Sequence, residues 1–360
     1  MRILEQMEKL GYEQLCLFTD PNVSLRAFIC IHDTTLGPAL GGLRIWKYGT
    51  EEEALTDVMR LARAMTYKSA AAGLSLGGGK AVIIADPYQG KSEAMMRAIG
   101  RCVESLNGRY ITTEDVGANA KDLEYIAQET SHLVGLPLSQ GGSGDTAPMT
   151  GFGVVTGMKA CAKEVWGDDS LAGRTIAIQG FGKVASETAK LLIKEDAKLI
   201  VADINSQAIE ESRKLPEVQI VSPDEIYDTQ CDIFCPCALG GTLNGTTIPK
   251  LKCSIVAGGA NNQLLAPADA HTLQDRHILY APDYIINAGG VINASLEIGQ
   301  TYDSKVSEEK TSQIYYTMEH VIWRSKREDI TTATAADRLA EERIKSAAKG
   351  RNIYLGSSSG

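Results

Sequence analysis

The stretch Thr175-Ile-Ala-Ile-Gln-Gly-Phe-Gly-Lys-Val-Ala185 decides the fold. Its first five residues predict a buried strand, and an amphipathic helix is expected after its last. Between them Gly180, Gly182 and Ala185 fit the pattern G-x-G-x-x-A, which in a strand–turn–helix context predicts a dinucleotide site. Gly180 permits the tight turn, Gly182 lets the backbone approach a pyrophosphate, and Ala185 allows close helix–strand packing. The amides at the helix N-terminus would face the phosphates.

An acidic residue follows at the spacing that such a site requires. The next predicted strand, 199–202, ends at Asp203, and 203 − 180 = 23 positions separate it from the first glycine. A carboxylate there can bind the ribose 2′-hydroxyl and repels a 2′-phosphate, and no Arg follows directly, so NAD is favoured over NADP. The alternative is a glycine turn that binds nothing, with Asp203 serving only as a helix cap.

Short apolar segments on both sides of this stretch predict the rest of the fold. After residue 149 they alternate with helical or turn-like segments, which indicates a parallel sheet with crossover helices. Before it, strands at 25–31, 40–46, 81–85 and 109–113 alternate with amphipathic helices, one of which begins at a Thr50–Glu53 capping box. The Gly-, Ser- and Pro-rich loop 135–144 is the expected boundary. We therefore expect an α/β protein with two domains, residues 1–140 and 141–329.

Composition excludes several classes of function. With 36 Lys+Arg and 45 Asp+Glu, the net charge of −9 argues against a nucleic-acid binder. No signal-like start and no apolar run near 18 residues is found, so no membrane partner is expected. Eight Cys in 360 residues are too sparse for a disulfide scaffold, which indicates a cytoplasmic protein. Cys231, Cys235 and Cys237 are interpreted as buried thiols, and no metal site is expected.

Two lysines and an aspartate are the candidates for chemistry. Lys68 and Lys80 stand among small and apolar residues, where lysines are uncommon. Lys80 follows three Gly and precedes the strand 81–85, so it is expected at a strand start. Two ammonium groups held close together and partly desolvated would lower the pKa of one of them, which suits proton transfer. Asp115, just past a strand end, is interpreted as a general base or as a helix cap.

Amide side chains follow other strands. Asn261 and Asn262 come after a strand of the second domain, and Asn287 precedes Gly289-Gly290. The carboxyl ends of strands in α/β sheets bind ligands. Asn also favours ordinary turns, so each of the three is interpreted as either a ligand contact or a turn residue.

Together these motifs resemble the glutamate/leucine/phenylalanine/valine dehydrogenase family over essentially the whole chain. The stretches that match its motifs are Leu36–Arg44, Met65–Lys68, Gly77–Lys80, Asn107–Ile111, Glu114–Gly117, Cys237–Gly240, Ala260–Leu264, Ala281–Tyr284 and Ile286–Gly290. The resemblance implies a Rossmann-like NAD-binding domain, a cleft between the two domains, and a C-terminal helix, about 330–355, that packs back on the first domain. Its members assemble through that first domain, so a homo-oligomer, an octamer or a dimer, is expected.

The resemblance also implies a reaction and roles for residues. NAD-dependent oxidative deamination would convert an L-amino acid reversibly into a 2-oxo acid, ammonium and NADH. Lys68 would hold the substrate carboxylate, Lys80 would activate water, and Asp115 would move protons to and from the amino group. Asn261 and Asn262 would position substrate and nicotinamide. The full set of expected cofactor-binding residues is Thr150, Gly180, Phe181, Gly182, Lys183, Val184, Asp203, Ile204, Cys237, Ala238, Asn262 and Asn287.

Substrate choice is read from the positions that match the family's side-chain pocket: Leu40, Gly41, Thr113, Val291 and Ala294. These residues are apolar or small, which favours leucine and other branched-chain L-amino acids over glutamate. Two of them depart from the leucine-acting pattern, because Thr113 narrows the pocket and Ala294 widens it. The loop 141–146 looks more like that of the phenylalanine-acting members. Phenylalanine, valine and tryptophan therefore stay open as substrates.

An alternative hypothesis, from a different functional class, is that the protein is a catalytically silent NAD-binding regulator that keeps only the Rossmann-like domain. Such a protein has no need of both lysines and the aspartate, whereas an enzyme of this family needs all three.

Overall fold

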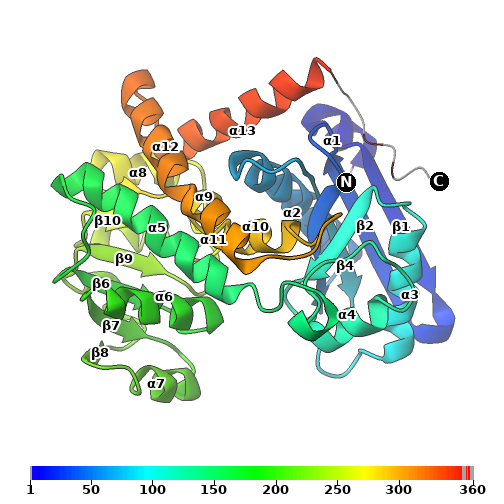
Figure 1. Cartoon of the computed structure of the whole chain (residues 1–360), viewed down its shortest axis with the longest axis horizontal. Helices are drawn as coiled ribbons and strands as arrows, with labels where there is room; N and C mark the ends of the chain where they lie inside the picture. Colours follow the sequence, from blue (N-terminus) through cyan, green and yellow to red (C-terminus); the bar gives the residue numbers. More distant parts are fainter. Residues whose placement is uncertain (1, 351–353, 355, 357–360) are drawn as a thin grey trace. The chain divides into compact units, whose positions relative to one another are not determined.

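The computed structural model describes residues 2–350, 354 and 356, and these form two compact units (Figure 1). Within the described residues, unit 1 takes in the chain up to Asp145, with 294–302 and the chain from Ala340 onward. Unit 2 is 146–293 with 303–339. The first unit thus extends beyond residue 140, and a short segment expected in the second domain belongs to it. No described helix is long and apolar enough to cross a membrane.

Unit 1 contains a five-stranded mixed sheet in the order β1-β2-β4-β3-β5. Strands β1 and β2 pair antiparallel, as do β2 and β4, while β3 pairs parallel to both β4 and β5. The strands are β1 Gln14–Asp20, β2 Leu25–Asp33, β3 Ala39–Trp46, β4 Gly77–Ile84 and β5 Tyr110–Glu114. Its helices are α1 Ile3–Leu10, α2 Glu51–Ala71, α3 Glu93–Glu104 and α4 Ala120–Ile126, and the end of α13 Thr332–Ala348 belongs to it.

Helix α2 begins where the sequence predicts and packs directly on the sheet. Thr50 accepts a hydrogen bond from the Glu53 amide, and the Glu53 carboxylate accepts one from the Thr50 amide, which confirms the capping box. Where α2 lies over β4, a Cβ on Gly78 would come within 2.0 Å of the Thr66 nitrogen. The glycines of β4 therefore let a helix and a strand approach more closely than side chains allow.

The strand β4 starts earlier than the sequence predicts, which changes the place of Lys80. The prediction began at Ala81, whereas β4 already includes Gly77, Gly78 and Gly79. Glycine is unfavourable in strands, so its presence at 77–79 does not predict that the strand extends over these residues. Lys80 is in mid-strand, opposite Cys30 of β2, and the prediction of a strand start was wrong.

Unit 2 contains a six-stranded, wholly parallel sheet in the order β11-β10-β9-β6-β7-β8. The strands are β6 Thr175–Gln179, β7 Lys198–Ala202, β8 Val218–Ile220, β9 Ile233–Pro236, β10 Ile255–Val256 and β11 Leu279–Tyr280. The chain order reverses between β6 and β9, which makes the carboxyl ends of these two strands the switch point where such sheets bind ligands. The predicted parallel sheet and α/β fold are confirmed.

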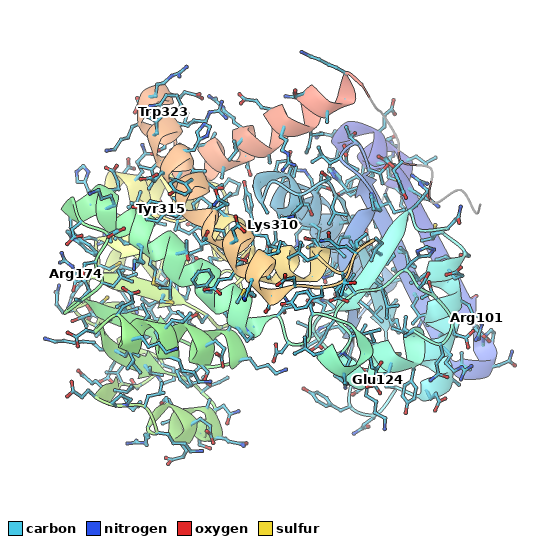
Figure 2. All side chains as sticks on the ribbon, in the orientation of Figure 1. Arg101, Glu124, Arg174, Lys310, Tyr315 and Trp323 are labelled. Carbon is cyan, nitrogen blue, oxygen red and sulfur yellow. The ribbon has the colours of Figure 1, made fainter. Side chains whose placement is uncertain are left out.

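Helices surround this sheet, and α5 packs against both α6 and α12 (Figure 1). They are α5 Ala147–Trp166, α6 Lys183–Lys194, α7 Ser206–Ser212, α8 Ala268–Asp275, α9 Asp283–Ile286, α10 Gly289–Ser295, α11 Ser304–Ser312 and α12 Ile314–Glu328. Figure 2 shows Arg174 and Trp323 on the outside of unit 2, and the Trp323 side chain is half exposed. The C-terminal helix was expected over 330–355. Helix α13 occupies Thr332–Ala348, and 351–353 and 355 lie outside the described residues.

Candidate active site

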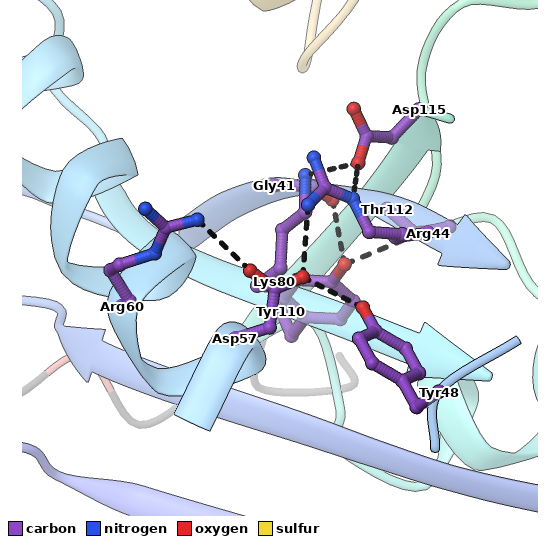
Figure 3. Close-up of polar contacts among 9 residues, drawn as sticks. All are labelled: Gly41, Arg44, Tyr48, Asp57, Arg60, Lys80, Tyr110, Thr112 and Asp115. Atoms are coloured by element: carbon purple, nitrogen blue, oxygen red, sulfur yellow. Dashed lines mark hydrogen bonds and ion pairs between the residues drawn. The ribbon is translucent and has the colours of Figure 1, made fainter. Parts of the chain in front are cut away.

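A buried ion pair joins Lys80 and Asp115 in unit 1 (Figure 3). Lys80 Nζ lies 2.9 Å from Asp115 Oδ2, and the two side chains are 6% and 21% exposed. Lys80 comes from mid-β4, and Asp115 comes directly after β5. Between these strands runs β3, where a Cβ on Gly42 would come within 2.7 Å of the Asp115 Cβ and 3.3 Å of Lys80 Nζ. Gly42 therefore leaves the space that the pair occupies.

A second pair of charges lies against the first. Arg44 of β3 donates from Nε to Asp115 Oδ2 at 3.0 Å and from Nη1 to Asp57 Oδ2 at 2.9 Å. Asp57, on α2, also accepts a hydrogen bond of 2.7 Å from the Tyr48 hydroxyl and one of 3.2 Å from Arg60. Figure 3 shows these groups around Lys80. Lys80, Arg44, Asp57 and Asp115 thus form one poorly exposed cluster of charges, and the exposed Arg60 contacts it at Asp57.

The cluster shifts the pKa of both members of the central pair. Burial lowers the pKa of Lys80 and the charge of Arg44 lowers it further, while Asp115 opposes both effects. Burial alone would raise the pKa of Asp115, but the charges of Lys80 and Arg44 outweigh it and hold that pKa at about 2. Asp115 is therefore a carboxylate at neutral pH, and Lys80 gives up its proton more readily than an ordinary lysine.

Tyr110 fixes the backbone of this region. Its hydroxyl donates a hydrogen bond of 2.6 Å to the carbonyl oxygen of Gly41, and its ring lies where a Cβ on Gly79 would stand. Burial raises the pKa of Tyr110, so its hydroxyl keeps its proton and stays a donor. Tyr110 thereby ties β3, β4 and β5 together at the level of the ion pair.

Lys68 lies in the last turn of α2, half-buried. It stands 68 − 57 = 11 residues after Asp57, close to three helical turns, so both residues occupy the same face of the helix. Because Asp57 contacts Arg44, the face of α2 that carries Asp57 and Lys68 is the face turned toward the cluster. The positive charge that lowers the pKa of Lys80 is that of the Arg44 guanidinium. The sequence instead predicted a neighbouring ammonium group.

Unit 2 holds the glycine turn at its switch point. Gly180 follows β6 with φ +90°, and a Cβ on it would come within 2.6 Å of the Ala238 Cβ just beyond β9. Both the left-handed backbone and the close approach require glycine. The turn therefore lies at the carboxyl ends of β6 and β9.

Gly182 differs from Gly180 because nothing in the described structure crowds it. A Cβ there would meet no atom within 4 Å, and its φ of −82° suits any residue. Gly182 is also the N-cap of α6, where no side chain caps the first amides. Open space beside uncapped helix amides fits a group that brings anionic oxygens to the backbone, such as a pyrophosphate.

Asp203 stands at the end of β7 and does not cap a helix. Its Oδ2 accepts a hydrogen bond from the Phe181 amide at 2.5 Å, and its Oδ1 accepts one from the Asn205 amide at 2.7 Å. The N-cap of α7 is Asn205. Asp203 thus joins the glycine turn to the end of β7 and stays half-exposed. Ile204 beside it is 91% exposed.

The amide cluster after β10 contains an unpaired polar atom. Asn287 Nδ2 donates to Asn261 Oδ1 at 2.9 Å, and the Asn287 side chain is buried. Its Oδ1 has no hydrogen-bond partner among the described residues. Asn262 adopts φ +53°, an uncommon backbone for a residue other than glycine. A buried carbonyl oxygen without a donor fits a ligand that brings an N–H, as a nicotinamide carboxamide does.

Comparison with known proteins gives the family. The family model "Glu/Leu/Phe/Val dehydrogenase, dimerisation domain" matches residues 17–132, and "Glutamate/Leucine/Phenylalanine/Valine dehydrogenase" matches 141–209 and 201–351. A leucine dehydrogenase of Thermoactinomyces intermedius is 51% identical over 355 residues, which covers 99% of this chain and 97% of that protein. This chain belongs to the glutamate/leucine/phenylalanine/valine dehydrogenase family.

Members that act on different amino acids are also similar to this amino-acid dehydrogenase. A phenylalanine dehydrogenase of Thermoactinomyces intermedius is 44% identical over 98% of this chain and 97% of that protein. The crystal structure of an L-tryptophan dehydrogenase from Nostoc punctiforme matches with a TM-score of 0.82 and 43% identity, over 96% of this chain and 99% of that one. The enzyme is an oxidoreductase that uses a nicotinamide cofactor, and the silent-regulator reading was wrong.

The residues predicted for the side-chain pocket are found on three elements. Leu40 and Gly41 lie buried in β3, and Thr113 is half-buried in β5, where it pairs with Gly42 of β3. Val291 and Ala294 lie on α10, which contains a boundary between the units, since Val291 belongs to unit 2 and Ala294 to unit 1. Unit 1 therefore contains Leu40, Gly41, Thr113 and Ala294, and unit 2 contains Val291.

The sequence predicted Lys80 and Asp115 as site residues, but it did not predict Arg44 and Asp57. Arg44 ends the stretch Leu36–Arg44 that resembles the family, but its local sequence predicts no role for it. Asp57 is an acidic residue of an amphipathic helix, a residue type that is mostly exposed, although its side chain is only 16% exposed. One signal was available, since Asp57 stands three residues after Ala54 and four before Leu61, which are both buried residues of α2.

Proposed function

We propose that this enzyme catalyses the reversible NAD-dependent oxidative deamination of L-leucine and other branched-chain L-amino acids to the 2-oxo acid, ammonium and NADH. The observation that carries the proposal is the buried Lys80–Asp115 pair, in which one member has a lowered pKa and the other is a carboxylate. The 51% identity to a leucine dehydrogenase supports the choice of substrate.

Unit 1 would bind the amino acid and move its protons. The Lys68 ammonium binds the substrate carboxylate. When the Cα–H leaves as a hydride, the substrate becomes an iminium ion. Asp115 first accepts a proton from the substrate ammonium, and Lys80 takes a proton from the water that attacks the Cα of the iminium ion. Asp115 then returns its proton to the amino nitrogen. When the C–N bond breaks, ammonia leaves, and the Asp115 carboxylate accepts the proton of the hydroxyl group that becomes the 2-oxo oxygen. A lysine with a lowered pKa suits the first step, because general bases work best with a pKa near the operating pH.

Unit 2 would bind the cofactor through the groups that its geometry presents. NAD supplies the hydride acceptor at its nicotinamide ring. The turn at Gly180–Gly182 and the first amides of α6 bind the pyrophosphate, and Asp203 binds the ribose hydroxyls. Asn261, Asn262 and Asn287 bind and orient the nicotinamide end and the substrate. The positions Thr150, Phe181, Lys183, Val184, Ile204, Cys237 and Ala238 complete the proposed cofactor contacts.

Replacing Asp203 by Asn tests the preference for NAD. Asn keeps the shape and one hydrogen-bond acceptor for the Phe181 and Asn205 amides but loses the charge that repels a 2′-phosphate. We expect the ratio of kcat/KM for NADP to that for NAD to rise on the order of 10-fold. Asp224→Asn, at an exposed site of the same unit, is the matched control and leaves the ratio unchanged. A ratio that does not move in Asp203→Asn assigns the preference to other residues.

A second candidate substrate is L-phenylalanine. Thr113 and Ala294 depart from the leucine-acting pattern, and a phenylalanine dehydrogenase is 44% identical to this chain. An apolar pocket separates side chains by only about 1–3 kcal/mol per methylene, so exchanges of this size can change the preference.

A substrate panel decides between these readings. The purified enzyme is assayed with NAD and each aliphatic and aromatic L-amino acid at alkaline pH, and NADH formation is followed by absorbance. We expect the highest kcat/KM with L-leucine. A higher value with L-phenylalanine would favour the second candidate, and no NADH from any amino acid would overturn the proposal. Assembly as a homo-oligomer, an octamer or a dimer, and a cytoplasmic location stay predictions, the first supported by the family's dimerisation domain at 17–132.

A further inference from the structure

The two cations that contact Asp115 bind the same oxygen. Lys80 Nζ lies 2.9 Å and Arg44 Nε 3.0 Å from Oδ2. In Figure 3 the other carboxylate oxygen points away from both. We propose that Arg44 is a positioning residue that, with Lys80, holds Asp115 by Oδ2 and thereby presents Oδ1 to the substrate's amino group. This inference rests on the proposed function, in which Asp115 exchanges a proton with that group.

Arg44 is itself held in one orientation. Its guanidinium donates from Nε to Asp115 and from Nη1 to Asp57, so two edges of one rigid plane are fixed. Asp57 is fixed in turn by the Tyr48 hydroxyl and by Arg60. A lysine at position 44 keeps the charge but presents a single ammonium on a flexible stem. It cannot reproduce both contacts with the same geometry.

The charged neighbours of Lys80 act on its pKa with opposite signs. Lys80 and Arg44 carry two positive charges, and Asp57 and Asp115 carry two negative charges. The groups that face Arg44 are Asp57 of α2, Lys80 of β4, Asp115 after β5 and Tyr48 after β3, with Arg60 and Lys68 on the same helix as Asp57. The charge of Arg44 lowers the pKa of Lys80, and the charge of Asp57 raises it.

Removing the charge of Arg44 or that of Asp57 should therefore shift the pH profile of kcat in a predictable direction. Oxidative deamination requires neutral Lys80, so kcat rises with pH as Lys80 loses its proton. Arg44→Gln raises the pKa of Lys80 and shifts the midpoint of this rise to higher pH. Asp57→Asn keeps the shape, lowers the pKa of Lys80 and shifts the midpoint to lower pH. A role in folding alone does not move the two midpoints apart.

The experiment measures kcat and KM for the best amino-acid substrate against pH in the whole enzyme. Arg44→Lys keeps the charge and loses the geometry, so we expect kcat to fall about 10- to 100-fold with its midpoint retained and KM changed much less. Arg44→Gln and Asp57→Asn are expected to shift their midpoints in opposite directions. Arg97→Gln, which removes an arginine from a 2.7 Å ion pair with Glu129 in the same unit, is the control and keeps the wild-type profile.

The possible outcomes separate this inference from the proposed function. Wild-type enzyme that forms no NADH from any amino acid overturns the function. Active wild type together with an Arg44→Lys variant of unchanged kcat overturns the positioning role. Midpoints that stay fixed or move in the same direction in Arg44→Gln and Asp57→Asn overturn the charge argument. Thermal unfolding and NADH fluorescence, recorded for every variant, show that each protein is folded and binds cofactor.

Discussion

Replacement of Lys80 by Ala is expected to lower kcat for amino-acid oxidation by about 10²- to 10⁴-fold while NADH binding is kept, because a general base of this kind contributes rate in that range. Lys80 is the buried cation in contact with Asp115, and its side chain is 6% exposed. Its loss also leaves Asp115 with only Arg44 at Oδ2. The cofactor-binding residues lie in the other unit, so cofactor affinity is expected to be retained. Stopped-flow absorbance and fluorescence titration with NADH measure the two quantities.

Lys91→Ala is the matched control for this prediction. Lys91 is also a poorly exposed lysine of unit 1, in a 2.6 Å ion pair with Asp122, and it donates to the Gly117 carbonyl. Its removal should lower the unfolding temperature and leave most of kcat. Equal losses of kcat in the two variants would show that any buried ion pair of this unit affects the rate in the same way, and Lys80 would then have no special role.

Gly182→Ala is expected to weaken the binding of NADH by about 10- to 100-fold without changing the unfolding temperature. A methyl group at this position meets no atom of the described structure within 4 Å, and φ is −82°, so the folded protein accepts it. The same methyl group would occupy the space through which a pyrophosphate reaches the α6 amides. Loss of one or two such contacts costs about 1.4–2.8 kcal/mol, which is 10- to 100-fold in affinity.

Gly245→Ala controls for the change from glycine to alanine. Gly245 lies in the same unit and likewise has no atom within 4 Å of a built Cβ. NADH affinity and the unfolding temperature should both stay at wild-type values. If Gly182→Ala binds NADH as tightly as Gly245→Ala does, the pyrophosphate does not approach the backbone at Gly182, and the proposed cofactor contacts of the glycine turn would have to be revised.

Local sequence signals predicted much of the fold. The strand Thr175–Gln179 is found with its predicted bounds because β-forming residues run directly into a glycine turn. The capping box at Thr50 is found because its two hydrogen bonds depend on residues only three positions apart. Strands β1 and β8 were missed. β8 has three residues, and β1 is an edge strand without a fully buried residue, so neither gives a clear hydrophobic period.

The sequence predicted Lys80 and Asp115 as residues of the candidate site, but it did not predict the hydrogen bonds of Arg44. Lys80 was predicted because lysines are uncommon among small and apolar residues, whereas Asp115 alone could also be a helix cap and its role came from the resemblance to the family. The hydrogen bond from Arg44 to Asp115 joins residues 71 positions apart, and that to Asp57 joins residues 13 apart. Such pairings follow from the order of strands in the sheet and from the helix that covers it. A single sequence does not contain that information in its local pattern.

The central claim is that Lys80 is an amine of lowered pKa beside Asp115, which is a carboxylate at neutral pH when no substrate is bound. Heteronuclear NMR of the enzyme labelled with ¹⁵N at lysine side chains, recorded over a pH series, follows the Lys80 Nζ directly, with the signal assigned by its absence in Lys80→Ala. We predict that this nitrogen loses its proton below the ordinary lysine value of about 10.4, and at the same pH as the midpoint of the kcat profile. A Lys80 Nζ that stays protonated up to or beyond that ordinary value would contradict the account.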